Sequence, residues 1–222
     1  MSSLALVVVL SYLLGAVPFS LVVARAHGVD LRQHGSGNAG ATNAWRVLGR
    51  GPGTLVFALD LLKGLVPVLL APRLAGADAA DLLGPWAPTW LAVIAGASAM
   101  LGHVYTVWGR LFFGSFKGGK GVATGAGMLL GLIPVAVGVG AVVFAGAMAA
   151  TRWVSLGSIL AAVSLPVTLG VQRALGAEVP PPVWAFALVV PVFIVWTHRA
   201  NVRRLLDGTE PRLSDKAARQ GT

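Results

Sequence analysis

The chain has no cysteine and few charged residues. Without cysteine, disulfides, iron–sulfur clusters and thiolate catalysis are excluded. Only 11% of the 222 residues are charged, whereas a soluble domain normally carries about 25%. Four histidines and eight acidic residues are present, and no two histidines have metal-ligand spacing, so we expect no metal site. The composition therefore points away from soluble, disulfide-bonded and metal-dependent proteins.

The chain is instead rich in long apolar runs, and 56% of its residues are hydrophobic. Runs of about 18 apolar residues indicate membrane-spanning helices. The first run is not preceded by a basic residue or followed by a clear cleavage site, so we interpret it as a span and not a signal peptide. The sequence predicts one all-α integral membrane domain over residues 1–222. The runs that reach or approach spanning length are Leu4–Ala24, Leu55–Ala71, Trp90–His103, Val122–Ala150, Val154–Val171 and Val183–Thr197.

The distribution of basic residues predicts the topology. Arginine and lysine are concentrated in segments 25–50 and 104–121 and in the tail after Thr197, which the positive-inside rule places in the cytoplasm. The N-terminus then lies outside, and residues 213–222 are expected to form a flexible cytoplasmic tail. The net charge of +9 is explained by these loops and by anionic lipid headgroups. Nucleic acid is therefore not expected as a partner.

The run 122–150 decides whether this topology is consistent. If it crossed the membrane once, the basic tail would end outside. Pro134 lies near its middle, and proline breaks or kinks a helix. Residues 122–133 would span roughly 18 Å and residues 135–150 roughly 24 Å, both less than the roughly 30 Å hydrocarbon core. We therefore predict seven transmembrane segments, two of them short, with a cytoplasmic C-terminus.

Residues 35–49 are the first of three predicted cytoplasmic stretches rich in groups that bind phosphate. Glycine lets backbone N–H groups approach an anion and form a concave nest. Hydroxyl groups and an arginine add neutral and charged donors. A short Gly/Asn segment alone would suggest a tight interhelical loop, but this density of donors favours a binding site. The candidate residues are Ser36, Gly37, Asn38, Gly40, Thr42, Asn43 and Arg46.

A second stretch, Phe116–Thr124, places two lysines among glycines before a predicted helix. A helix N-terminus favours negative charge, and Lys120 is a compact cation for a phosphate oxygen. Gly118 and Gly119 could turn backbone donors toward the same ligand. The stretch is not a Walker A loop, because the G-x-x-x-x-G-K-[ST] pattern is absent. Lys117 fits a juxtamembrane loop that contacts lipid headgroups, whereas Lys120 fits a binding site better.

The third stretch is His198–Glu210. If the last spanning helix continues into it, His198 and Asn201 lie one turn apart on one face. Histidine offers a proton-transfer group near neutral pH, and asparagine offers both a donor and an acceptor. Arg203 and Arg204 are equally consistent with two roles: basic residues that set the membrane topology, or residues of the binding site.

Two weaker features lie within the spans. Asp60 and Lys63 are three residues apart, and intramembrane charges are costly, so they usually pair or line a site. Mutual pairing is the favoured interpretation. Ser155 and Ser158 lie near the cytoplasmic end of a span, where small polar residues usually make helix-packing contacts. We keep both serines as substrate-binding candidates.

The three stretches, in this order, resemble the bacterial acyl-phosphate–glycerol-3-phosphate acyltransferase family, the small integral membrane type. The similar segments are G-S-G-N-A-G-A-T-N-A-W-R-V-L-G, F-K-G-G-K-G-V-A-T and H-R-A-N-V-R-R-L-L-D-G-T-E. The segments D-L-L-K-G and R-W-V-S-L-G-S are also similar. The H-x-x-x-x-D signature of the soluble-headed glycerolipid acyltransferases is absent.

The resemblance implies seven transmembrane helices in the bacterial inner membrane, with the active site at the cytoplasmic face. It implies transfer of a fatty acyl group from acyl phosphate to the sn-1 hydroxyl of glycerol 3-phosphate, giving lysophosphatidate and phosphate. No cofactor, metal, coenzyme A or acyl carrier protein is expected. By resemblance, the site positions are Ser36, Arg46, Lys120, His198 and Asn201, with Thr42 and Asn43 nearby.

One segment departs from the family pattern. The family usually has a short link before F-K-G-G-K-G, with a proline after an aromatic residue. Here Thr106 follows Tyr105, and Gly109–Ser115 is longer than usual. The role of the adjacent His103, kept as a secondary candidate, is therefore open.

The residue types suit a mechanism based on positioning and charge. Arg46 is assigned to an anionic headgroup and Lys120 to the acyl-phosphate group, to which Ser36 donates a hydrogen bond. Asn201 would orient the attacking hydroxyl, and His198 would hold a phosphate or hydroxyl. The proton acceptor is either His198 or a substrate phosphate.

Two other classes of protein fit parts of this pattern. Glycine loops, arginine and a helix broken at Pro134 also describe the midplane site of an anion transporter or channel. The clustering of motifs at one face and the lack of an inverted repeat disfavour that class. A lipid-binding scaffold would need no clustered asparagine, histidine and serine. The sequence predicts no oligomeric state.

Overall fold

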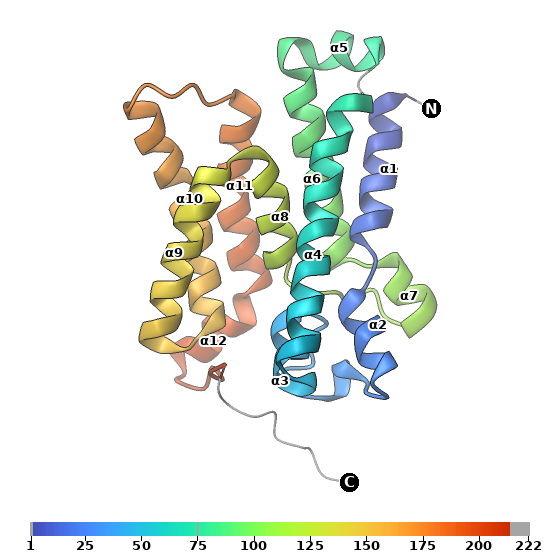
Figure 1. Ribbon diagram of the computed structural model, residues 1–222, viewed down its shortest axis with the longest axis vertical. Coiled ribbons are helices and arrows are strands. Elements are labelled where there is room, and N and C mark those ends of the chain that lie inside the picture. The colour runs from blue at the N-terminus through green and yellow to red at the C-terminus, as the bar shows by residue number, and fades with distance from the viewer. Residues whose placement is uncertain (1, 75, 214–222) are drawn as a thin grey trace.

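The computed structural model describes residues 2–74 and 76–213, which form a bundle of helices (Figure 1). Among these residues the backbone is helical apart from its connections and an isolated bridge between Tyr105 and Lys117, so the all-α prediction is confirmed. Short 3₁₀ turns lie at Leu31–Gln33, Ala71–Leu74 and Gly84–Trp86. The α-helices are α1 (Ser3–Gly15), α2 (Phe19–Ala26), α3 (Ala41–Leu48), α4 (Arg50–Leu70), α5 (Ala77–Leu83), α6 (Ala87–Val104), α7 (Val107–Phe113), α8 (Val122–Leu132), α9 (Pro134–Thr151), α10 (Val154–Ala174), α11 (Pro181–Thr197) and α12 (Arg199–Leu206).

The chain is an integral membrane protein. Within the described residues, five helical stretches are long and apolar enough to cross a membrane. The helices α11 and α12, which meet at an angle of 63°, make a sixth if they are taken together, and α8 is a shorter apolar helix. The five stretches are Ser3–Ala26, Arg50–Leu74, Asp78–Val104, Pro134–Thr151 and Val154–Ala174.

The helix breaks agree in part with those predicted. The 122–150 run divides at Ile133, and Pro134 is the first residue of α9, where its missing N–H costs nothing. Because proline starts this helix and does not interrupt it, α9 reaches 18 residues and is itself long enough to span. The prediction that both halves are short is therefore wrong for α9. The last helix does not continue straight, since it bends at His198.

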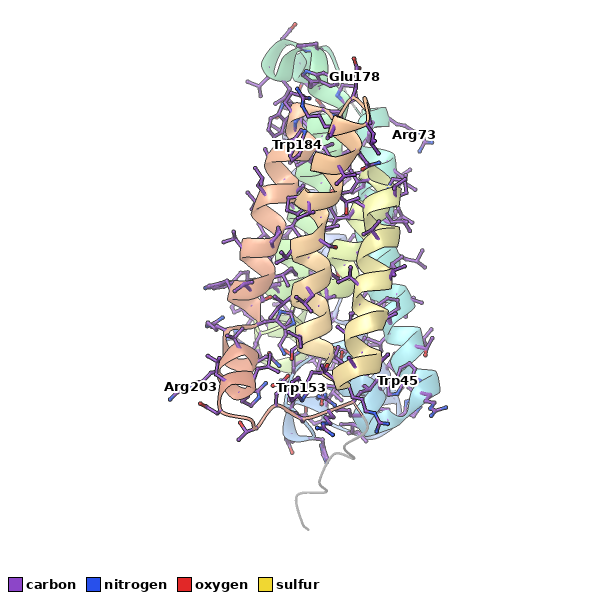
Figure 2. The ribbon with its side chains drawn as sticks, turned by 90° about the vertical axis from the view of Figure 1, so that its left-hand side faces the viewer. Trp45, Arg73, Trp153, Glu178, Trp184 and Arg203 are labelled. Atoms are coloured by element: carbon purple, nitrogen blue, oxygen red, sulfur yellow. The ribbon has the colours of Figure 1, made fainter. Side chains whose placement is uncertain are left out.

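Basic residues are concentrated at one end of the bundle. Figure 1 shows α2, α3 and α12 at this end, and α5 and the N-terminus at the other. The side view in Figure 2 places Trp45, Trp153 and Arg203 at the basic end and Arg73, Glu178 and Trp184 at the opposite end. The backbone N–H of Leu213 donates to Arg152 O at 2.9 Å, so the chain is still held at this residue. Residues 214–222, the rest of the predicted flexible tail, lie outside the described residues.

The helices α4 and α8 meet backbone to backbone. A Cβ placed at Gly127 would lie 1.9 Å from Leu61 O, and one at Gly64 would lie 2.0 Å from Thr124 O. Small residues allow this approach in membrane bundles, where packing drives helix association. Since α8 starts just after Lys120, this contact fixes the position of the second predicted stretch.

A side chain at Gly127 should therefore destabilise the bundle. We expect Gly127→Val to cost about 1–3 kcal/mol through overpacking, measured by thermal or denaturant unfolding in detergent. Gly138→Val is the matched control, because Gly138 lies in α9 with nothing within 4 Å of an added Cβ. Equal effects of the two substitutions would contradict the close contact between α4 and α8.

Candidate functional site

A cavity of about 330 Å³ lies at the basic end of the bundle, between the three predicted stretches and helices α8 to α11. Its apolar interior is lined by Leu129, Val137, Phe144, Leu165, Val190 and Ile194. The remaining predicted residues, Gly37, Lys63, Gly118 and Gly119, are not among its lining residues. The predicted residues that do line it are Ser36, Asn38, Gly40, Thr42, Asn43, Arg46, Asp60, His103, Lys120, Ser155, Ser158, His198 and Asn201.

Asn43 holds the first loop in shape. Its Oδ1 accepts from the backbone N–H of Ser36 at 2.9 Å, and its Nδ2 donates to Leu31 O and His34 O, each at 3.0 Å. The side chain is 1% exposed. Because both ends of the amide are engaged within the protein, Asn43 positions the backbone of Ser36, and its contact with substrate stays a prediction. Gly37 has a φ of +66°, so its glycine is required by the turn.

The glycines of the second loop pack against the end of α6. The Gly118 N–H donates to Val104 O at 2.9 Å and so is not available to an anion. A Cβ at Gly118 would lie 1.9 Å from His103 O, and one at Gly119 would lie 2.2 Å from His103 Nε2. The interpretation of Gly118 as an anion donor is thus replaced by a packing role, whereas phosphate binding at Gly119 stays a prediction. His103 is the residue that supports this loop.

Lys120 is half-buried at the cavity, just before the first turn of α8. Thr197 Oγ1 donates to Lys120 O at 3.1 Å, which ties the second stretch to the third. Burial is the main cause that lowers the pKa of Lys120, to about 8, with Arg204, Arg46 and Lys117 adding repulsion and Glu210 opposing it. The lysine is therefore a cation that can still lose its proton near neutral pH.

His198 and Asn201 are brought together at the bend between α11 and α12. The Nδ1 of His198 lies 2.8 Å from Ile194 O, so in the neutral ring the proton sits on Nδ1 and Nε2 is an acceptor. The Nδ2 of Asn201 donates to Glu210 Oε1 at 2.6 Å, and its Oδ1 is buried without a hydrogen-bond partner. An unpartnered buried acceptor at a cavity is suited to a donor on a ligand.

Glu210 is the site residue to which the sequence analysis gave no role. Its carboxylate, 3% exposed, accepts from Ser155 Oγ at 2.7 Å, from Asn201 at 2.6 Å and from Arg204 Nε at 2.8 Å. Burial alone would raise the pKa of Glu210, but these three hydrogen bonds and the charge of Arg204 outweigh it and hold the pKa below its usual value. The only signal in the sequence was the position of Glu210 at the end of the third stretch.

Glu210 also explains two neighbouring residues. By sequence Arg204 fits either a topology anchor or a site residue, and its ion pair with Glu210 places it at the site. Ser155 binds Glu210 from the start of α10, while Ser158 donates to Val154 O one turn earlier in its own helix. Arg46 Nη2 donates to Pro211 O at 3.0 Å. The segment after α12 is thus held to α3 through Arg46 and to the start of α10 through Ser155.

The charges inside α4 pair with each other, as predicted. Lys63 Nζ lies 2.7 Å from Asp60 Oδ1 and donates to Val17 O at 2.8 Å. His103 Nδ1 lies 3.6 Å from the same Asp60 oxygen. These buried groups join α4 to the α1–α2 junction and to α6, and Asp60 and His103 also reach the cavity wall.

A family model of glycerol-3-phosphate acyltransferases matches residues 5–208. Relatives named glycerol-3-phosphate acyltransferase include one from Geobacter sulfurreducens, 45% identical over 91% of this chain and 93% of its own length. The chain belongs to the glycerol-3-phosphate acyltransferase family. A relative of that name from Halalkalibacterium halodurans is 42% identical over 95% of this chain and 96% of its own.

The fold agrees with a solved member of the family. It is similar to the crystal structure of PlsY (YgiH), an integral membrane glycerol 3-phosphate acyltransferase, in its glycerol 3-phosphate form. The TM-score is 0.79 with 40% identity over 95% of this chain and 96% of that one. The lysophosphatidic acid form gives a TM-score of 0.78 with 39% identity, over 95% of each chain. The resemblance found in the three stretches is therefore confirmed as family membership.

Glu210→Gln tests the part that Glu210 plays. The amide keeps the size but loses the charge that three donors share, so we expect a loss of about 1.5–3 kcal/mol in unfolding free energy, measured by unfolding in detergent. Asp207→Asn is the control, because Asp207 is 59% exposed and its pair with Arg203 is 3.9 Å long. A Glu210→Gln protein as stable as Asp207→Asn would contradict the role of Glu210 as the centre of this network.

Proposed function

We propose that this protein transfers a fatty acyl group from acyl phosphate to the sn-1 hydroxyl of glycerol 3-phosphate, releasing phosphate. The observation that supports this most directly is the cavity, which joins an apolar interior to a mouth with Lys120, Arg46 and Arg204. An acyl phosphate has the same two parts, a hydrocarbon chain and a phosphate. Family membership and the glycerol 3-phosphate and lysophosphatidic acid forms of the related structure give further support.

The proposal includes the topology. Seven transmembrane segments follow if the five long stretches are joined by the short α8 and by the bent pair α11–α12. The basic end then faces the cytoplasm by the positive-inside rule, with the N-terminus outside and the C-terminus inside. The protein would lie in the bacterial inner membrane, where lipid can deliver the acyl chain and cytoplasm can deliver glycerol 3-phosphate.

In the proposed mechanism the sn-1 oxygen attacks the carbonyl carbon of the acyl phosphate. An ester bond forms, the bond between carbonyl carbon and phosphate oxygen breaks, and phosphate leaves with the electron pair. The mixed anhydride is already activated, so positioning and charge stabilisation supply the catalysis without a covalent enzyme intermediate.

Each group has one role in this step. Lys120 neutralises the leaving phosphate, and Ser36 donates a hydrogen bond to it. Arg46 binds the phosphate of glycerol 3-phosphate. Asn201 Oδ1 accepts a hydrogen bond from a glycerol hydroxyl, since Glu210 holds the amide in that orientation. The attacking hydroxyl donates to His198 Nε2, and its proton passes either to that nitrogen or to a phosphate oxygen.

The direct test mixes purified protein in detergent with acyl phosphate and labelled glycerol 3-phosphate. We expect labelled lysophosphatidate and one phosphate per ester formed, and no product when acyl-coenzyme A replaces acyl phosphate. Product from acyl-coenzyme A alone would overturn the donor. No product from either donor, together with anion flux across sealed liposomes, would instead favour a transporter.

Lys120 gives the proposed reaction a pH dependence. As pH rises through about 8, the free enzyme loses the Lys120 proton and with it the cation, so kcat/KM should fall on the alkaline side. Lys120→Met should lose at least about 100-fold in kcat, the scale of removing one stabilising donor in the transition state. Lys117→Met is the control, because Lys117 is exposed and lies outside the cavity. Equal losses in the two variants would remove Lys120 from the mechanism.

A further inference from the structure

The segment that departs from the family pattern forms α7, which projects sideways from the bundle. Figure 1 shows it beside the α1–α2 junction, on the opposite side from α9 and α10. Its inner side is fastened to α1: Trp108 Nε1 donates to Leu13 O at 2.8 Å, and Thr106 Oγ1 donates to Ala16 O. The same Thr106 oxygen accepts from the Gly109 N–H at 2.8 Å and caps the helix. α7 is therefore a fixed element and not a loose loop.

The outer side of this element is apolar and uncovered. Leu111 is 64% exposed, Phe112 is 67% exposed and Phe116 is 53% exposed. Several large apolar side chains that stay exposed within and just after one short helix mark an interaction surface.

Aromatic residues place this surface at the level where the spanning helices end. Tyr105 follows the last residue of α6, and Trp196 is one residue before the end of α11. Their rings lie 6.5 Å apart, and both residues are 45% exposed. Tyrosine and tryptophan at span ends are typical of the boundary between hydrocarbon and headgroups. Phe116 lies next to Lys117, which bridges to Tyr105.

Cations border the apolar surface. The Arg110 guanidinium lies 6.0 Å from the Phe116 ring centre, and Arg25 lies 5.8 Å from that of Phe113. Lys117 is exposed, and residues 104–121 contain no acid. The adjacent Arg32 donates to Phe113 O but is paired with Asp30 at 2.9 Å. A helix with apolar side chains beside basic ones that form no ion pair within the described part of the chain is suited to the interface of an anionic membrane.

We propose that α7 and Phe116 form a membrane-interface anchor that binds anionic phospholipid. Leu111, Phe112 and Phe116 lie among the acyl chains, and Arg110 and Lys117 contact the phosphate headgroups. The surface favours lipid over a protein partner because it lies at the level of the span ends and its charge complements acidic headgroups. This contact is independent of the acyl-transfer reaction.

The cysteine-free chain allows a direct test. A Leu111→Cys protein, labelled with an environment-sensitive fluorophore, is reconstituted in vesicles of phosphatidylcholine and phosphatidylglycerol. We expect quenching by lipid that carries a spin label near the headgroup and protection from aqueous acrylamide. Arg203→Cys is the control, because the Arg203 side chain is 87% exposed on α12, and it should show the opposite pattern. A Leu111 label that acrylamide quenches as fully as the control label would overturn the proposal.

The lipid charge is tested in the same labelled protein. Spin-labelled phosphatidylglycerol should quench the Leu111 label more strongly than spin-labelled phosphatidylcholine at equal mole fraction. Arg110→Gln with Lys117→Gln should abolish that difference, whereas Arg203→Gln should leave it unchanged. Equal quenching by the two lipids before any charge is removed would overturn the anionic part of the proposal, even with the acyltransferase active.

Discussion

The backbone contact between α4 and α8 is the constraint on which the site depends. At Gly64 and Gly127 the two helices meet with no side chain between them, so α8 has little freedom to shift along α4. Lys120 stands just before the first turn of α8, and its height in the bundle is thereby set. The same helix α4 carries Asp60, whose ion pair and His103 contact support the loop from the other side. The contact at Gly64 and Gly127 thus positions Lys120. Among the contacts described, the Lys120 side chain makes no hydrogen bond of its own.

A buried carboxylate at the proposed phosphate site would be unfavourable on its own, because like charges repel. Glu210 is tolerated because Arg204 neutralises it and Ser155 and Asn201 donate to it. Hydrogen bonds inside a protein of low dielectric are strengthened, and unpaired groups are penalised. The carboxylate therefore orients its neighbours and is not an uncompensated negative charge in the cavity.

The cavity has a polar and an apolar region because the elements that line it change from polar to apolar with distance from the basic end. Toward the basic end it meets loops with polar side chains, while α8, α9, α10 and α11 supply apolar ones further in. A ligand with a charged head and a hydrocarbon tail satisfies both. The loop that carries Lys120 is held next to the end of α6 by the hydrogen bond from the Gly118 N–H to Val104 O.

The amino-acid sequence alone predicts an all-helical membrane protein of this family, a break of the 122–150 run next to Pro134, and three stretches that meet. These properties follow from local composition, from proline geometry and from motif order. That Gly118 and Gly119 lie against the end of α6 follows from helix packing. Tertiary structure also placed Glu210 against Ser155, and Arg46 against a carbonyl 165 residues away. Such partners depend on how helices pack in three dimensions, and neither spacing nor periodicity along one segment carries that information.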